Sequence, residues 1–281
     1  MEEEWTTVIK PKTGWIDLNL KEIWYYRDLI YMFLKRNFTS SYKQTILGPL
    51  WFLISPLMTS SMFTVVFGQI AKISTDGVPQ FLFYMAGNTA WSYFSTCLTA
   101  TSSTFTGNAY LFGKVYFPRL VSPITSVIYA LLSFSIQLVM MLVLMAFFTF
   151  ARGEAVYPNF WILLVPLMIL QMAMLGLGLG IIISSLTTKY RDLSILVGFG
   201  VSLWMYATPI VYPMSQVPEF LQQIIKLNPM APVVNNFRYA FLGCGTPEIR
   251  SWLISMVVTV VFLFLGVILF SRVEKTFMDT V

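Results

Sequence analysis

Long stretches without any charged side chain decide what this chain can fold into. Two of them, Leu120–Ala151 and Ala155–Thr188, exceed the roughly 20 residues that a helix needs to cross the ~30 Å hydrocarbon core of a bilayer. In all, 57% of the residues are hydrophobic and only 11% are charged, whereas a soluble domain carries about 25% charged residues. Helices satisfy their own backbone hydrogen bonds in lipid, so we expect an all-α integral membrane protein.

The apolar runs divide into six spans that form one transmembrane domain over residues 46–281. No charge lies in the core of any span, which argues against proton- or sodium-coupled transport, because such transporters usually keep an acid inside the membrane. Gly176 and Gly180 are predicted to let the fourth span approach a neighbouring helix closely. The predicted spans lie at about 50–71, 80–101, 120–150, 160–184, 193–212 and 251–271.

The distribution of basic residues predicts the orientation of the chain. With the N-terminus inside, the inner segments hold 13 of the 18 Lys and Arg residues and the outer segments hold 5. Basic residues favour the cytoplasmic side, so both termini are expected in the cytoplasm. Residues 1–17 are expected to form a polar tail, because they lack the basic region and apolar core of a signal peptide. The basic residues flank spans instead of forming a patch, so the net charge of +5 does not indicate nucleic-acid binding.

Residues 18–45 precede the first span, and Leu18–Arg36 within them has the pattern of an amphipathic helix lying in the membrane interface. Lys35 and Arg36 lie opposite its apolar face. Arg27 falls inside that face, where it either snorkels to lipid phosphates or meets the anionic head of a substrate arriving from the cytoplasm. The apolar face consists of Leu20, Ile23, Trp24, Ile30, Tyr31 and Leu34.

Two short apolar pieces follow the fifth span, within residues 216–241. Gln216–Leu227 and Met230–Phe241 have helical spacing of their apolar residues but are too short to cross a bilayer. We therefore expect two re-entrant or interfacial helices on the outer side. Arg238, in the second piece, either snorkels or holds the pair shut through a polar contact. The proline residues that punctuate this region are Pro209, Pro213, Pro218, Pro229 and Pro232.

Few residues suit catalysis or metal binding. The chain has no histidine, and Cys97 and Cys244 lie far apart without a metal-binding spacing, so no metal site is expected. Arg191 and Asp192, at the inner end of the fifth span, form either a salt bridge or a helix N-terminus at which Asp192 offsets the helix dipole.

The connection at residues 102–119 contains a segment, Gly107–Val115, that superficially resembles a phosphate-binding loop. It has five residues between its glycines instead of four, and valine where Ser or Thr must reach magnesium. The chain is therefore not expected to carry its own ATPase. This compact basic connection either docks a partner protein or is an ordinary cytoplasmic connector.

Aromatic residues make up 16% of the chain and cluster in the second and fifth spans. Most such rings form interface belts or pack in cores. The alternative is a surface for sugars, because flat rings stack on the apolar faces of pyranoses. The clusters contain Tyr84, Trp91, Tyr93, Phe94, Trp204, Tyr206 and Tyr212.

Four motifs in fixed order resemble the membrane subunit of ABC-type polysaccharide exporters, which move O-antigen, capsule or teichoic acid chains. They are YKQTILGPLWFLISPL (42–57), GNAYLFGKVYFPRLVSP (107–123), KYRDLSILVGFGVSLWMYATPIVYP (189–213) and LNPMAPVVNNFRYAFLG (227–243). The resemblance covers nearly the whole chain from Trp15. It implies a homodimer in the bacterial cytoplasmic membrane that moves a lipid-linked polysaccharide. It also implies two cytoplasmic ATPase subunits that bind ATP and Mg²⁺, with no cofactor on this chain.

The resemblance also implies roles for residues of this chain. Coupling to the ATPase is expected of Asn108, Tyr110, Lys114 and Arg119. An outer gate made of the two short helices would be hinged by Pro209, Pro213 and Pro229, with Arg238 in its second helix. The lipid pyrophosphate would meet Arg27, Lys35, Arg36 and Lys43. The rings expected along the glycan path are Trp51, Tyr84, Trp91, Tyr93, Phe94, Trp204, Tyr206 and Tyr212.

Three other functions remain open on the sequence. An exporter of drugs or small lipids from the same superfamily would share the predicted architecture. A membrane enzyme acting on lipid-linked sugars would need paired catalytic acids, and Asp192 is the only acid between the inner ends of the spans. A structural scaffold in the membrane is the third.

Overall fold

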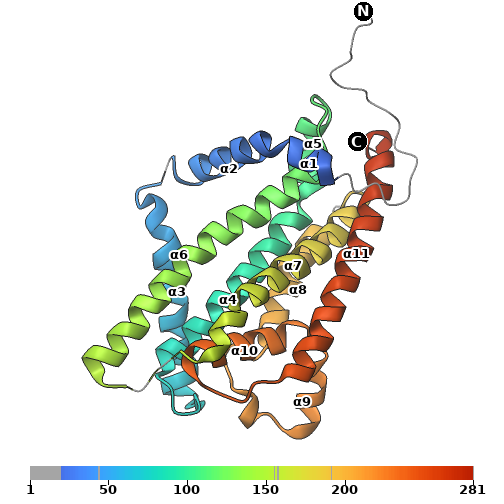
Figure 1. Ribbon diagram of the computed structural model, residues 1–281. Coiled ribbons are helices and arrows are strands. Elements are labelled where there is room, and N and C mark those ends of the chain that lie inside the picture. Colours follow the sequence, from blue (N-terminus) through green and yellow to red (C-terminus); the bar gives the residue numbers. More distant parts are fainter. Residues whose placement is uncertain (1–19, 44, 155, 157, 191, 281) are drawn as a thin grey trace, which may run out of the picture.

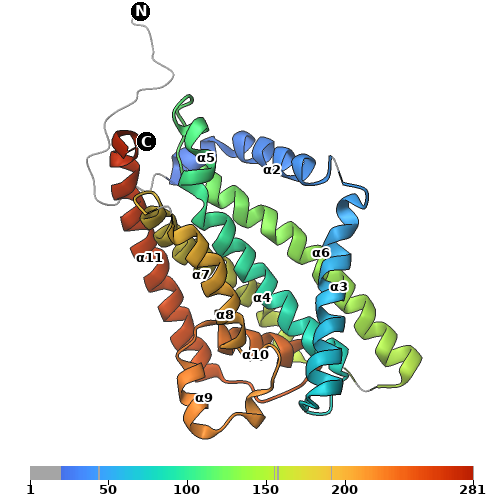
Figure 2. The ribbon, with the colours of Figure 1, turned by 180° about the vertical axis from the view of Figure 1, so that it is seen from behind.

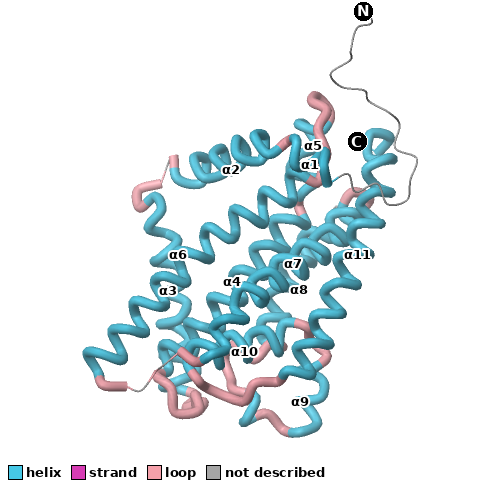
Figure 3. Tube along the Cα trace, in the orientation of Figure 1, coloured by secondary structure: helices cyan, strands magenta, loops and turns pink. Residues whose placement is uncertain are grey.

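The computed structural model describes residues 20–280 except 44, 155, 157 and 191, and every regular element in that part of the chain is a helix (Figure 1). Connecting loops gather at the two ends of the bundle (Figure 3). The shorter helices are α1 (Leu20–Tyr25), α2 (Arg27–Tyr42), α5 (Thr104–Phe112), α9 (Glu219–Lys226) and α10 (Met230–Leu242). The helices of the main bundle are α3 (Trp51–Phe63), α4 (Gln80–Ser102), α6 (Val121–Arg152), α7 (Val165–Thr187), α8 (Leu193–Tyr206) and α11 (Ile249–Thr280).

Helix α4 is the centre of the bundle. It packs against α3, α6, α7, α8 and α10, and α7 packs in turn against α11 (Figures 1 and 2). Most of its side chains are buried, including the large rings of Phe83, Tyr84 and Phe94. A helix in contact with neighbours on most sides needs little polar surface, which explains why its buried positions do not follow a single stripe.

Glycine residues set the spacing between α4, α7 and α11, as the sequence indicated. A Cβ atom added at Gly176 or Gly180 would lie 2.6 Å from the Cβ atom of Cys97 or Thr101 on α4. Gly178 faces the other way, and a Cβ there would lie 2.7 Å from the backbone of Leu263 on α11. Small residues let helix backbones meet closely in lipid, where packing and not water exclusion drives association.

Four helical segments in the described residues are long and apolar enough to cross a bilayer: Gly48–Ile70, Val121–Arg152, Phe160–Thr187 and Ile249–Val273. These match four of the six predicted spans. The other two are helices, but length and composition do not establish them as spans. Helix α4 has 23 residues and is more polar, and α8 is apolar with only 14 residues.

The N-terminal amphipathic region differs from the single helix predicted over 18–36. It forms α1 and α2, separated by a break at Tyr26, and α2 continues to Tyr42. Of the predicted apolar face, Trp24 and Tyr31 are exposed, whereas Ile30 packs against the rest of the chain together with Leu29 and Phe33. The break shifts the register of α2 relative to α1, so one stripe cannot run through both. Residues 18 and 19 lie outside the described part.

The connection predicted as a loop over 102–119 contains a helix, α5, over Thr104–Phe112. Its Phe105 and Phe112 are buried, and this anchoring stabilises the helix although it contains Gly107 and Asn108, which have low helix propensity. Helices α9 and α10 form within the two short apolar pieces predicted after the fifth span. The bundle has two distinct ends, with α1, α5 and the C-terminal end of α11 at one and α9 and α10 at the other (Figure 1).

We expect the Gly178→Ala variant to lose roughly 1–3 kcal/mol of stability, because the added methyl group meets backbone that cannot rotate away. Thermal unfolding of the purified protein in detergent measures this loss. The matched control is Gly200→Ala on α8, where nothing lies within 4 Å of the added atom. The control is expected to be neutral or slightly stabilising, because Ala favours helices over Gly. Equal melting temperatures for the two variants would contradict the close-packing role.

Candidate functional site

A strip of hydroxyl groups on α4 escapes burial. Ser92 and Ser95 are partly exposed, and Thr96, Thr99 and Ser103 are exposed, at spacings that place them on one helix face. Their hydroxyl groups donate backwards along the helix: Ser95 to the carbonyl of Ser92 at 3.1 Å, and Thr99 to that of Ser95 at 2.7 Å. Each of these hydroxyl groups donates its hydrogen to the backbone, so its oxygen can still accept a hydrogen bond from another molecule. This hydroxyl strip was not anticipated from the sequence, although the 3–4 residue spacing of Ser and Thr was readable there.

Helices α3 and α8 both pack against α4, the helix that carries the hydroxyl strip (Figure 2). All residues of α8, Leu193–Tyr206, are described, and none of them is buried. Its outer face presents Ile195, Phe199, Leu203 and Tyr206, at positions that repeat every three or four residues. A helix so lightly packed in the protomer has a large apolar face free to meet lipid or a second copy of the chain.

The aromatic residues predicted along a glycan path fall into two groups. Tyr84, Trp91, Tyr93 and Phe94 are buried and pack the core of the protomer. Trp204, partly exposed, seals this core, with its ring centroid 5.2 Å from that of Phe94 and 6.1 Å from that of Trp91. Trp51 and Tyr206 are 46% and 54% exposed, and Tyr212 is partly exposed. Whether these rings touch a glycan stays a prediction, and in this conformation the first four lie inside the protomer.

Asn228 joins the end of α8 to the start of α10. Its Oδ1 atom accepts from the indole Nε1 of Trp204 at 2.9 Å and from the backbone N–H of Met230 at 2.9 Å. Its Nδ2 atom donates to the Thr208 hydroxyl at 2.8 Å and to the Ala207 carbonyl at 3.2 Å. One amide thus fixes the fifth predicted span to the second short helix. The sequence signal was the Asn-Pro pair before a helix, which is a typical turn and helix start.

Arg238 does not snorkel. Its side chain is only 2% exposed, and its Nη2 atom donates to the carbonyl groups of Pro209 and Ile210, both at 3.0 Å. The guanidinium carbon lies 3.7 Å from the centroid of the Phe83 ring, within range of a cation–π contact. Arg238 thus makes a polar contact, but with the segment after α8; it makes no hydrogen bond to α9, so a role in holding the two short helices together stays a prediction.

The other prolines predicted as hinges also lie at element boundaries. Pro213 is buried directly before the short helix Met214–Gln216, and Pro229 occupies the N-cap position of α10. Lys226 at the end of α9 forms an ion pair of 3.0 Å with Glu248 before α11. Proline fixes φ at each of these junctions, and a hinge role for them stays a prediction.

At the opposite end, aromatic side chains tie α2 and α5 to the bundle. Phe33 of α2 meets Phe117 with ring centroids 5.7 Å apart, and Phe117 meets Phe112 of α5 at 5.5 Å. Phe105 of α5 stacks on Phe270 of α11 at 4.8 Å. We call this set the end cluster; it comprises Phe33, Phe105, Phe112, Phe117, Val121, Ile181 and Phe270. These ring contacts connect α5 to both α2 and α11.

Of the residues predicted to couple to an ATPase, some hold α5 to the bundle and others are exposed. Asn108 donates to the Thr104 carbonyl at 3.0 Å and to the Ser122 hydroxyl at 2.9 Å, so it fastens α5 to the start of α6. Arg119 lies 5.7 Å from the ring centroid of Phe112. Tyr110 is 75% exposed and receives a hydrogen bond from Lys114. Lys114, Val115 and Tyr116, which follow α5, are exposed as well. We call these three residues and Tyr110 the knob.

The basic residues predicted to meet a pyrophosphate all lie on exposed surface of α2 or just after it. Arg27, Lys35, Arg36 and Lys43 are exposed, and Arg36 donates to the Asn37 side chain at 3.2 Å. They do not converge on one pocket but follow the length of the helix. Such a row suits a layer of lipid phosphates or a diffusing anionic head group.

Asp192 occupies the N-cap position of α8, although its side chain makes no capping hydrogen bond. Arg191 lies outside the described residues, so the predicted pair cannot be placed. Cys97 and Cys244 are both free and buried. No cluster of three or more metal-ligating side chains occurs in the described part of the chain.

Comparison with known proteins finds similarity along most of the chain. The model of the ABC-2 type transporter family matches residues 28–242, more than half of the sequence. An O-antigen export system permease protein RfbA from Myxococcus xanthus is 26% identical over 265 residues, covering 93% of this chain and 98% of the relative. A protein of the same name from Klebsiella pneumoniae is 27% identical over 256 residues, covering 91% and 95%.

We expect Asn228→Ala to loosen the junction of α8 and α10. Hydrogen exchange of the amides at 230–234 should accelerate by about tenfold, because the start of α10 loses its side-chain acceptor. Mass spectrometry of exchanged peptides measures the rate. Gln223→Ala on the exposed face of α9 is the control and should leave the same peptide unchanged. An unaltered rate in Asn228→Ala would show that the amide does not hold this junction.

Proposed function

Because the chain belongs to the ABC-2 type transporter family, we propose that it is the permease subunit of an ATP-driven exporter of a lipid-linked cell-surface polysaccharide. The transport role follows from the family. The polysaccharide substrate is supported by relatives named as O-antigen export permeases, which align with over nine-tenths of this chain. An O-antigen-like or capsular chain is the substrate we favour.

The exposed knob on α5 is the observation that carries the partnership with an ATPase. The sequence offers no functional phosphate-binding loop, so ATP and Mg²⁺ would be bound by a separate cytoplasmic subunit. The knob presents Tyr110, Lys114, Val115 and Tyr116 to that subunit. Behind it, the end cluster provides a rigid connection to α2 and α11, through which a push on the knob would reach the bundle.

A homodimer would form through the lightly packed face of α8. Two copies related by a two-fold axis bury the same surface on both, which suits a continuous apolar face. The hydroxyl strips of two α4 helices would then line a polar path at the dimer interface, together with the exposed rings of Trp51 and Tyr206. Weak, repeated hydrogen bonds to sugar hydroxyls suit processive movement, because a tight site would stall the chain.

Substrate would enter on the α2 side and leave past α9 and α10. The row of Arg27, Lys35, Arg36 and Lys43 offers an anionic pyrophosphate successive contacts at the membrane surface. At the outer end, Asn228 and Arg238 attach α10 to α8 and to the segment after it, so a shift of α8 would move the outer helices as a gate. This scheme has six spans, both termini in the cytoplasm and a location in the bacterial inner membrane.

We expect the double variant Tyr110→Ala, Tyr116→Ala to co-purify with markedly less of the ATPase partner and to lose most export activity. Two exposed interface rings are removed while the end cluster stays intact, and such anchors often contribute about 2 kcal/mol each. Phe150→Ala, an exposed ring at the other end of α6, is the control. Full association and export after deletion of residues 108–116 would refute the coupling role.

The dimer is tested by single cysteines on α8. The native thiols are buried, so a new cysteine reports contact between copies. We expect at least one of Ile195→Cys, Phe199→Cys and Ser202→Cys to form a disulfide-linked dimer in native membranes, and Phe150→Cys to form none. Monomers in all three oxidised samples would exclude this face as the interface.

Export itself is tested in proteoliposomes containing this chain and an ABC ATPase that co-purifies with it. We expect ATP-dependent movement of a lipid-linked glycan. In cells, loss of the gene should leave lipid-linked glycan inside. Export of drugs or small lipids without glycan would establish the rival transport function, and normal surface glycan in the deletion strain would contradict the proposal.

A further inference from the structure

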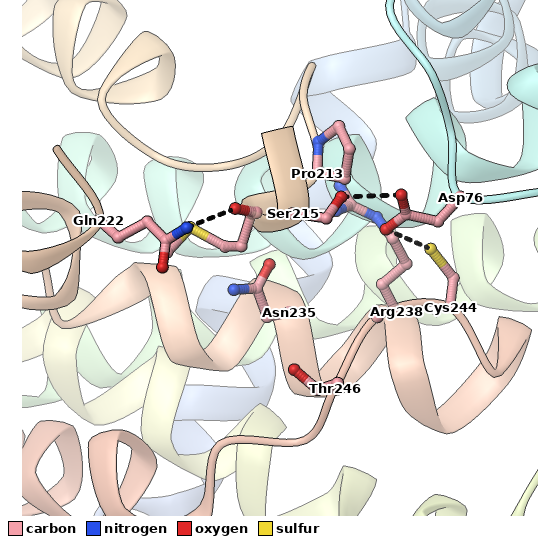
Figure 4. Close-up of a pocket in the computed structure, with 10 residues that line it drawn as sticks. Asp76, Pro213, Ser215, Gln222, Asn235, Arg238, Cys244 and Thr246 are labelled. Carbon is pink, nitrogen blue, oxygen red and sulfur yellow. Dashed lines mark hydrogen bonds between the residues drawn. The ribbon is translucent and has the colours of Figure 1, made fainter. Parts of the chain in front are cut away.

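A polar cavity of about 390 Å³ lies in the outer end of the molecule, apart from the hydroxyl strip. Its walls come from the loop before α4, the segment after α8, helices α9 and α10, and the loop that follows α10 (Figure 4). This volume lies within the ~300–1,000 Å³ typical of small-molecule sites. Neither the coupling nor the transport scheme above uses it.

Arg238 provides a buried cation to this cavity. Its Nη2 atom is occupied by two backbone carbonyl groups, and its buried Nε atom has no hydrogen-bond partner among the described residues. No described acid is close enough to form an ion pair with it. An unsatisfied N–H group on a buried charge costs stability unless a ligand or water accepts from it. The Nη1 amino group makes no hydrogen bond within the described part of the chain, so Arg238 keeps this group as a donor for a ligand.

Asp76 provides an acceptor on the exposed side of the cavity. One carboxylate oxygen accepts from the Ser215 hydroxyl at 2.8 Å, and the Sγ atom of Cys244 lies 4.0 Å from the other (Figure 4). Burial raises the pKa of the Cys244 thiol to about 11, although nearby Arg238 opposes this, so the thiol stays a neutral donor. Asp76 is held in a left-handed backbone conformation, with φ of 51°, directly before Gly77. This unusual conformation fixes the loop that presents the carboxylate.

Three neutral side chains complete the lining. Gln222 uses its amide nitrogen to donate to the carbonyl groups of Met214 and Val217, at 3.2 and 2.7 Å, which leaves its oxygen as an acceptor. Asn235 and Thr246 make no side-chain hydrogen bond within the described part of the chain. The cavity therefore offers donors and acceptors in mixed order around one cation and one anion.

This combination of charges selects the class of ligand. An anion that reaches Arg238 is repelled by Asp76, and a cation that reaches Asp76 is repelled by Arg238. A zwitterion also pairs with both groups, and the choice of a neutral ligand over it rests on the proposed export function. A neutral molecule with several hydroxyl groups satisfies both, because each hydroxyl donates to a carboxylate or amide oxygen and accepts from an N–H group.

We propose that this cavity binds one neutral saccharide unit at the outer face of the protein. The choice of a saccharide over other neutral polyols rests on the proposed export function. The cavity contacts Pro213, Met214 and Ser215, which follow α8, and α10 through Arg238. An occupied cavity therefore holds the segment after α8 against α10, the two parts that must separate if the outer end opens. The site receives the leading sugar of an emerging chain or a free sugar outside the cell.

Saturation-transfer NMR on the purified chain in nanodiscs tests the proposal. The probes are the methyl glycosides of glucose, galactose, mannose and N-acetylglucosamine, with glycine and inorganic phosphate as charged comparisons. We expect binding of at least one glycoside, and no competition by phosphate or glycine. Asn235→Leu fills the cavity and Thr246→Ala removes a hydroxyl; each should weaken binding by about tenfold or more. Gln223→Ala, outside the cavity, should bind as the unaltered protein does.

Asp76→Asn separates a saccharide site from an anion site. Asparagine tolerates the left-handed backbone and keeps an acceptor for Ser215. Loss of the charge should weaken a glycoside, because a carboxylate is the stronger acceptor, whereas it would strengthen phosphate. Unchanged glycoside binding in this variant, phosphate binding by the unaltered protein, or the absence of glycoside binding in the unaltered protein overturns the proposal. Export in proteoliposomes is measured in parallel: export without glycoside binding rejects this inference alone, and failure of export rejects the proposed function.

Discussion

The close approach of α4, α7 and α11 is the contact on which the rest of the structure depends. Glycine at 176, 178 and 180 lets backbones meet at distances that any side chain would prevent. Lipid tails are as apolar as the helix faces, so burying an apolar face against another helix gains no hydrophobic free energy. Dispersion between closely packed helices must therefore hold the bundle together. With α7 pressed between two neighbours, α4 becomes central and most of its surface is covered.

Two features of the candidate site follow from this central position. The large rings of α4 turn inward and fill the protomer, so they serve packing in this conformation. The hydroxyl strip lies on the part of α4 that its neighbours leave uncovered. Helix α8, which packs against α4, has no buried residue, and these two observations are the basis of the proposed path shared with a second copy.

The two ends of the bundle are fastened by different chemistry. At one end, rings of α2, α5 and α11 interlock in the end cluster, which suits a part that transmits a mechanical push. At the other end, Asn228 and Arg238 hold short helices through hydrogen bonds to backbone carbonyl groups. Directional bonds of this kind break and reform with small displacements, whereas packed rings do not. For this reason we assign the proposed opening and the proposed ligand to the end that carries α9 and α10.

The sequence by itself determined the class of protein, the approximate positions of four spans, the close packing of the fourth span through glycine and the two short helices after the fifth span. These depend on local composition and periodicity, which a bilayer constrains strongly. Only the tertiary structure decided that Tyr84 and Trp91 lie inside, that 104–112 is a helix, and that Arg238 is buried with Asp76 across one cavity. Those properties depend on which faces meet, and residues such as 76 and 238 come together through packing that no local pattern encodes.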